Sequence, residues 1–169
     1  MTPVVYILCG TQFAGKTTLA HTLAMQCGWT HVEVDAIAES LLDSSDSEVT
    51  EEQWTVSFNT SYEQVAASLA RGKSVVHDAT NYARIARDRV REIAHQFGVP
   101  VHVIYMAVPI EEANQRRIAN QAQPQRHDVS DAGFLELVSS LEPPTADESV
   151  FVFDGTLDVV TWIERFICD

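Results

Sequence analysis

The sequence predicts an α/β fold built on a doubly wound, five-stranded parallel sheet, and two observations predict it. Short, continuous apolar runs alternate with segments of helical periodicity along the 169 residues, and strands that are covered on both faces have this pattern. The first apolar run, about residues 3–9, leads directly into a glycine-rich loop that opens a helix at Lys16. A chain of this length is expected to form one domain, residues 1–169.

The glycine-rich loop reads G-x-x-x-x-G-K-T between a strand and a helix, which is the P-loop pattern. Gly10 and Gly15 allow backbone N–H groups to approach phosphate oxygens, and Lys16 adds a positive charge. The Thr17 hydroxyl is the expected Mg²⁺ ligand, so ATP and Mg²⁺ are the expected cofactors. Nucleotide binding is predicted for Gly10, Thr11, Gln12, Phe13, Ala14, Gly15, Lys16, Thr17 and Thr18.

Capping residues mark the ends of the elements in the first half of the chain. Gly28 suits the end of the first helix, and Thr50 with Gln53 resembles a capping box that opens a long helix. The expected elements are a strand at about 3–9, a helix from Lys16 to about Gln26, a strand at about His31–Val34 that closes on Asp35, a short helix within 36–50, a helix from Thr50 to about Arg71, and a strand at Ser74–His77 that ends on Asp78.

The second half continues the alternation, and Gly98 and Pro100 separate a helix from the next strand. Ile85, Val90, Ile93, Ala94 and Phe97 are expected to face the core from that helix. The expected elements are a helix at Tyr82–Phe97, a strand at Val101–Ala107, a helix at Ile110–Asn120, a polar loop at Gln121–Asp128, a helix at Asp131–Leu141, a strand at Val150–Phe153 and a helix at Leu157–Ile167.

Composition and charge indicate which partners and which cellular location to expect. The net charge of −13 disfavours a general polyanion-binding surface. The three cysteines have no metal-ligand spacing, which favours a reduced, cytoplasmic protein, and the six histidines form no ligand-like cluster. No apolar run is long enough to span a bilayer, so no membrane partner is expected. The oligomeric state is not indicated.

Other P-loop classes lack support in the sequence. The N-K-x-D motif by which a GTPase reads guanine is absent, and so is an L-S-G-G-Q-like transporter signature. The larger ring ATPases need a longer chain than this one. The small kinases remain, and the expected fold is therefore a nucleoside-kinase-like P-loop NTPase with a helical lid.

The chain resembles the AAA-type P-loop kinases related to polynucleotide 5′-kinase, zeta toxin and chloramphenicol phosphotransferase over about residues 3–155. The resemblance rests on the P-loop and on four further features: a strand that ends at Asp35, the segment Val75-Val76-His77-Asp78-Ala79-Thr80-Asn81 with arginines after it, Val108-Pro109 leading into a helix with Arg116-Arg117, and Leu141-Glu142-Pro143-Pro144 with Glu148 beyond.

Two carboxylates are predicted to act beside the P-loop. The resemblance implies that Asp35 is the general base for the acceptor hydroxyl, and its place at the carboxyl end of a strand agrees, although a cap of the next helix is the alternative. Asp78 could hold Mg²⁺ through water, contact the acceptor or cap the Thr80-Asn81 turn, and the sequence does not rank these three roles.

Arginines of a lid, about residues 114–130, are expected to stabilise charge on the migrating phosphoryl group. Arg116 matches the family's lid arginine in its spacing, whereas the second lid arginine falls on Asn120, for which Arg126 could compensate. Arg117 could equally be a solvated helix arginine. For Arg84 and Arg87 a role as surface charges is favoured over substrate contact. By analogy of fold, residues 153–156 are expected near adenine.

These features predict an ATP- and Mg²⁺-dependent kinase that phosphorylates a hydroxyl, with Asp35, Lys16, Arg116 and Arg126 as catalytic residues and Thr17 and Asp78 as metal ligands. The alternatives are a polynucleotide or nucleoside kinase and an ATP-binding switch. The acceptor region is expected at about 36–72. Between Lys16 and Arg71 the chain has nine carboxylates and neither lysine nor arginine, so a small neutral or cationic molecule or a protein side chain is favoured over nucleic acid.

Overall fold

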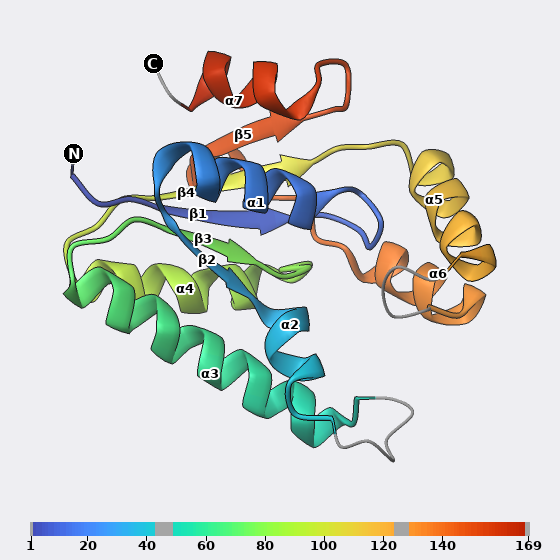
Figure 1. Ribbon diagram of the computed structural model, residues 1–169, viewed down its shortest axis with the longest axis horizontal. Coiled ribbons are helices and arrows are strands. Elements are labelled where there is room, and N and C mark those ends of the chain that lie inside the picture. The colour runs from blue at the N-terminus through green and yellow to red at the C-terminus, as the bar shows by residue number, and fades with distance from the viewer. Residues whose placement is uncertain (1, 43–48, 124–128, 168–169) are drawn as a thin grey trace.

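The computed structural model describes residues 2–42, 49–123 and 129–167. It contains a five-stranded sheet in the order β2-β3-β1-β4-β5, and every pair of neighbouring strands is parallel. The predicted doubly wound α/β fold is therefore confirmed (Figure 1). The strands are β1 (Val5–Cys9), β2 (Thr30–Glu33), β3 (Val75–Asp78), β4 (Val101–Met106) and β5 (Val150–Phe153).

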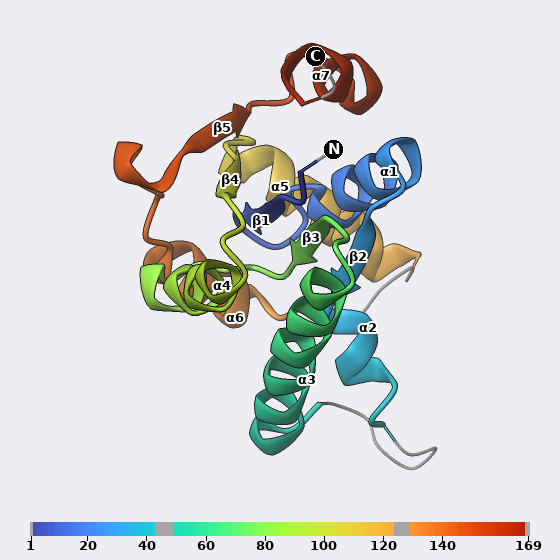
Figure 2. The same cartoon turned by 90° about the vertical axis from the view of Figure 1, so that its left-hand side faces the viewer.

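Four helices cover the two faces of this sheet, as Figures 1 and 2 show. On one face, Leu19 and Leu23 of α1 and Trp162 of α7 pack with buried side chains of the strands. On the other face, Val65 of α3 and Val90 of α4 pack against the opposite side chains of the strands. The bounds of these helices are α1 (Lys16–Cys27), α3 (Glu51–Ala70), α4 (Arg84–Gln96) and α7 (Val159–Phe166).

The helix ends follow the predicted capping chemistry. The Thr50 hydroxyl accepts a hydrogen bond from the Gln53 backbone N–H, and the Gln53 side-chain oxygen accepts one from the Thr50 backbone N–H, so the capping box opens α3. Gly28 ends α1 with a φ of 67° and donates to the Ala24 carbonyl. The second strand ends one residue earlier than predicted, because Val34 already begins the short helix α2 (Val34–Glu39).

The predicted inner face of α4 is wrong at both ends. Ile85 is 79% exposed and Phe97 is 40% exposed, whereas Arg87 is 1% exposed. The helix is turned so that Arg87, Val90, Ile93 and Ala94 face inward. A buried arginine is tolerated there because Glu148 pairs with it, with an Nε–Oε2 distance of 2.8 Å and an Nη2–Oε1 distance of 3.0 Å. The reading of Arg87 as a surface charge is therefore wrong.

Two further helices, α5 (Ile110–Ala122) and α6 (Asp131–Ser140), stand at the end of the sheet to which the strands point (Figure 1). The short 3₁₀ helix η1 (Ala146–Glu148) directly precedes β5, and its Glu148 pairs with Arg87 of α4. Among the described residues, none of the helices is both long enough and apolar enough to cross a bilayer.

Candidate active site

The P-loop connects the end of β1 to the start of α1. A Cβ atom at Gly10 would lie 2.9 Å from the Cβ atom of Met106, so only glycine leaves room for this backbone. Gly15 has a φ of 92°, which glycine adopts without strain. The Lys16 ammonium group donates to the Gly10 carbonyl at 3.1 Å and to the Thr11 carbonyl at 2.7 Å. Its charge is therefore held inside the loop.

Phe13 ties the P-loop to the helices at the carboxyl end of the sheet. It is 6% exposed, its φ is 61°, and its ring packs with Ala113 of α5 and Phe134 of α6. Val129 and Val138 complete this contact. The loop is thus attached to α5 and α6 by an apolar anchor.

Two cavities flank the loop, and Phe13 and Thr18 line both. The first has a volume of about 730 Å³ and is lined by Arg116 and Asn120 of α5 and by the segment between β5 and α7. That segment includes Phe153 and Gly155 from the region expected near adenine. The first cavity therefore has the position expected for a nucleotide.

The second cavity has a volume of about 470 Å³ and lies on the other side of the loop. Its polar lining includes Glu33, Asp35 and Glu39 from the end of β2 and from α2. Trp54 of α3 and Val129 close other sides of it. We call this space the acceptor cavity, because it lies on the predicted acceptor side of the P-loop.

A small pocket of about 30 Å³ brings together two of the predicted catalytic residues and both predicted metal ligands, but not Arg116. Lys16, Thr17, Asp35 and Asp78 all line it, together with Glu33. The oxygen atoms of Thr17 and the three carboxylates are the kind of ligand that Mg²⁺ prefers, so this donor set fits the expected metal. Of the three roles left open for Asp78, this placement favours those that involve the metal or the acceptor.

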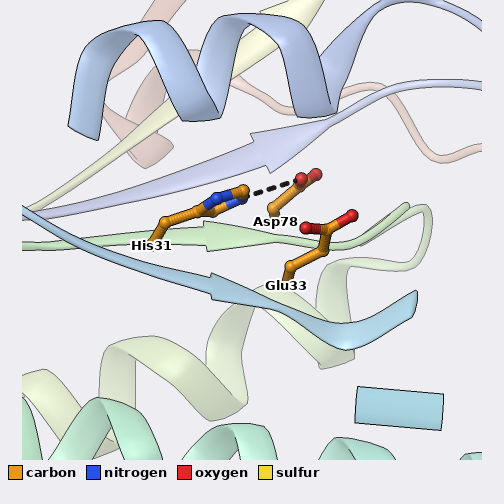
Figure 3. Close-up of side chains that lie close together, drawn as sticks. All are labelled: His31, Glu33 and Asp78. Carbon is orange, nitrogen blue, oxygen red and sulfur yellow. Dashed lines mark hydrogen bonds and ion pairs between the residues drawn. The ribbon is translucent and has the colours of Figure 1, made fainter. Parts of the chain in front are cut away.

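Glu33 and His31 are site residues that the sequence analysis missed. In the parallel register Glu33 lies opposite Asp78, and His31 precedes Glu33 by two residues on the same face of β2. Figure 3 shows the three side chains together, and each offers a ligand atom within 4.8 Å of the others. The signal was the alternation of His31 and Glu33 at the end of a strand beside one that ends in aspartate.

The electrostatics of this cluster follow from burial and from crowded carboxylates. His31 Nε2 lies 3.1 Å from Asp78 Oδ2, and Asp78 is 3% exposed. Burial raises the pKa of Glu33, and the charges of Asp78, Asp35 and Glu39 raise it further, while His31 opposes them. A cation at this position would therefore relieve repulsion among the carboxylates.

Arg116 and Arg117 differ in their surroundings. Arg116 Nη1 donates to the Phe13 carbonyl at 3.3 Å, and the side chain faces the first cavity, where it also pairs with Glu112. Arg117 is 3% exposed and binds Asp131 at 2.6 Å and the Val129 carbonyl at 2.9 Å. Arg117 therefore holds α5 to α6 rather than being solvated. Arg126 and residues 124–128 of the predicted lid lie outside the described residues.

The segment Asp78-Ala79-Thr80-Asn81, which we call the D-A-T-N segment, is hydrogen-bonded to β1 and to the first residue of the P-loop. Asn81 Nδ2 donates to the Leu8 carbonyl at 2.7 Å, and Gly10 N–H donates to the Thr80 carbonyl at 3.2 Å. Arg87 in turn donates to the Asn81 carbonyl at 2.9 Å. Burial lowers the pKa of His77 to about 4, against the charge of Asp78, so this imidazole is neutral and structural. The segment positions the loop through hydrogen bonds.

Comparisons with known proteins agree with this geometry. A family model described as an AAA domain matches residues 5–144. Shikimate kinase 2 of Serratia proteamaculans is 25% identical over 160 residues, which span 92% of this chain and 88% of that protein. A candidate kinase from Chloroflexus aurantiacus has a TM-score of 0.80 at 21% identity, covering 99% of this chain and 100% of that one.

A gluconokinase from Sinorhizobium meliloti has a TM-score of 0.69 at 18% identity, over 97% of this chain and 89% of that one. These structural likenesses show the P-loop NTPase fold. The more specific resemblance to the kinases related to polynucleotide 5′-kinase, zeta toxin and chloramphenicol phosphotransferase stays a prediction. Because the family model covers well over half of the chain, the protein belongs to the AAA domain family.

Proposed function

We propose that this protein is an ATP- and Mg²⁺-dependent kinase that transfers the γ-phosphoryl group to a hydroxyl of a small molecule. The observation that carries the proposal is the pair of cavities on opposite sides of one P-loop, with Asp35 in both the acceptor cavity and the pocket that contains Lys16. A kinase needs a space for each of its two substrates, whereas an ATP-hydrolysing switch needs only the first.

The proposed roles at the nucleotide follow from charge. Lys16 and the N–H groups of the P-loop bind the phosphates, and the lysine leaves its carbonyl partners in the loop to do so. Thr17 and Asp78 hold Mg²⁺, with Glu33 beside them, and the ion neutralises phosphate charge. Arg116 lies across the P-loop from these groups and stabilises negative charge on the phosphoryl group in transit.

Asp35 is proposed to act as the general base. Its carboxylate accepts the hydroxyl proton of the acceptor while the acceptor oxygen forms a bond to the γ-phosphorus. The bond between that phosphorus and the β–γ bridging oxygen breaks, and ADP leaves. Asp35 lies in the first turn of α2 and Glu33 occupies the cap position before that helix, so a capping role for Asp35 is not supported.

The relatives support this class of reaction. The matched proteins include kinases named for shikimate and gluconate, which are small hydroxyl compounds. Both of these acceptors are carboxylates, whereas the acceptor cavity here is lined by carboxylates of the protein. We therefore carry over the phosphoryl transfer and not the acceptor.

The test is transfer of labelled phosphate from γ-labelled ATP to a broad panel of hydroxyl compounds. Lys16→Ala should abolish nucleotide binding or turnover, and Asp35→Asn should lower kcat by about 10²–10⁴ with little change in ATP affinity. Circular dichroism should show that both variants fold. Glu63→Gln, which changes an exposed carboxylate of α3, is the control and should behave as wild type.

Two results would contradict the proposal. ATP hydrolysis at a rate that no acceptor changes would favour a switch. An Asp35→Asn variant with normal kcat and reduced stability would show that Asp35 is structural.

A further inference from the structure

We propose that the acceptor is a small cationic amino alcohol, whose ammonium group binds Glu39 and the face of Trp54 while its hydroxyl reaches Asp35. This inference rests on the proposed kinase function and names its substrate class. The ammonium group would lie in the outer part of the acceptor cavity, beyond the small pocket that Lys16, Asp35 and Asp78 line.

The charge of the acceptor cavity is the first observation. Glu33, Asp35 and Glu39 line it, and its described lining includes neither lysine nor arginine. Lys16 lies behind it in the smaller pocket, where its ammonium group is hydrogen-bonded into the P-loop. An anionic acceptor would meet carboxylates without a compensating positive side chain among the described residues, so the cavity selects against anions.

The second observation is the position of Glu39. It follows Asp35 by four residues on α2, and residues at this spacing share one face of a helix. At a rise of about 1.5 Å per residue, the two backbone positions are about 6 Å apart along the helix axis. Among the described residues, none forms a salt bridge with Glu39. This carboxylate is thus available to a ligand one helical turn away from the proposed base.

The third observation is the mixed lining of the outer cavity. Trp54 presents an indole ring, and Leu42 and Val49 add apolar surface. An ammonium ion is attracted to the face of an indole ring, and the attraction grows as water is excluded. The Oε1 atom of Gln12, which also lines the cavity, is buried and has no hydrogen-bond partner among the described residues. An ammonium group of the ligand would bind the indole face of Trp54, and a further N–H or O–H donor would bind the Oε1 atom of Gln12.

Spacing limits the size of the acceptor. A hydroxyl at Asp35 and an ammonium group near Glu39 are separated by four residues of helix, about 6 Å along the axis. A sugar ring that carries both groups, or a flexible five-carbon chain that is not fully extended, can place a hydroxyl and an amine at this separation. The cavity volume of about 470 Å³ accommodates a molecule of this size.

The experiment compares matched acceptors that differ only in charge. One series is 5-amino-1-pentanol, its N-acetyl derivative and 5-hydroxypentanoate. The other is glucosamine, N-acetylglucosamine and glucuronate. The kcat/KM for transfer from γ-labelled ATP is measured for each at neutral pH. We expect the cationic member to exceed the neutral one by tenfold or more and the anionic one to be the poorest in each series.

Variants test whether Glu39 causes the preference for cationic acceptors. Glu39→Gln should reduce the ratio of cationic to neutral kcat/KM at least several-fold, mainly through the KM of the cationic acceptor, whereas Glu63→Gln should leave the ratio unchanged. Equal or better use of the neutral or anionic member would overturn the inference while the kinase function stands. If no member of either series is phosphorylated, the inference is overturned. The proposed function fails as well only if the broad panel of hydroxyl compounds also yields no labelled product and leaves the rate of ATP hydrolysis unchanged.

Discussion

The Arg87 guanidinium is the centre of a buried polar network under the P-loop. It contacts both oxygens of Glu148 and the Asn81 carbonyl, while Arg91 reaches the same Glu148 carboxylate from a more exposed position. A buried charge that loses its partner is costly because water cannot replace that partner. The two arginines are therefore not equivalent, although both pair with one glutamate.

Arg87→Met is expected to lower the free energy of unfolding by about 3–5 kcal/mol, because it leaves Glu148 buried with a weaker partner. Arg91→Met, in which the lost arginine is 23% exposed, should cost about 1 kcal/mol. Urea denaturation of both variants measures the difference. Equal losses would show that the two arginines contribute alike to the pairing with Glu148, despite their different burial.

Glu148 also predicts how stability depends on pH. Burial would raise its pKa, but hydrogen bonds from Arg87, the Thr145 backbone and Arg91 outweigh burial and lower the pKa to about 2. A lowered pKa in the folded state contributes stability above the unfolded pKa of about 4.5, and this is lost as the pH falls toward 2.

The stability lost over this range through Glu148 is of the order of 3 kcal/mol. Unfolding free energies measured between pH 5 and pH 2 should therefore decline more steeply for wild type than for Glu148→Gln. Parallel curves for the two proteins would show that this carboxylate titrates normally.

Among the elements, α5 and α6 act as one unit that is joined to the P-loop. Arg117 links the two helices, and its guanidinium carbon lies 5.5 Å from the centre of the Phe134 ring. Phe13 connects this pair to the loop. Movement of these helices is thus coupled to the conformation of the P-loop.

Phe13→Ala is expected to loosen α5 and α6, because removal of a buried phenyl ring costs roughly 3 kcal/mol of packing. Amide hydrogen exchange in α6 should quicken by tenfold or more, while exchange in β1 and β4 changes less. Leu135 lies on α6 and is 62% exposed. Leu135→Ala is therefore the matched control and should leave hydrogen exchange in α6 unaltered. Unchanged protection of α6 in Phe13→Ala would show that the two helices do not depend on this anchor.

The sequence predicted the elements well and their orientation less well. Gly28 and the Thr50 capping box set helix ends by local chemistry, which a sequence displays directly. The inward face of α4 depends instead on Glu148, which is distant in the chain and makes a buried Arg87 acceptable. Periodicity alone selects the apolar Ile85 for the core, because it contains no information about a remote partner.

At the scale of the whole molecule, the site is a product of parallel topology. β1, β2 and β3 all point to one edge of the sheet, so their carboxyl ends deliver Lys16, Asp35 and Asp78 to one pocket. This convergence could be predicted, since it needs only the strand direction. The alternation of His31 and Glu33 places both on one face of β2, but their approach to Asp78 depends on the β2–β3 register, which the sequence does not display.

The order of strands also has a consequence for synthesis on the ribosome. β1 is the first strand to be made, yet it lies in the middle of the sheet, where Val5 pairs with Val75 and Val101. A nascent chain that ends before β4 leaves one edge of β1 without its native neighbour, and closing such long loops is slow. The P-loop is therefore translated before both strands that flank β1, and it gains its native surroundings only after β4 has been made. Until then, the growing chain presents an apolar strand edge of the kind that chaperones shield from aggregation.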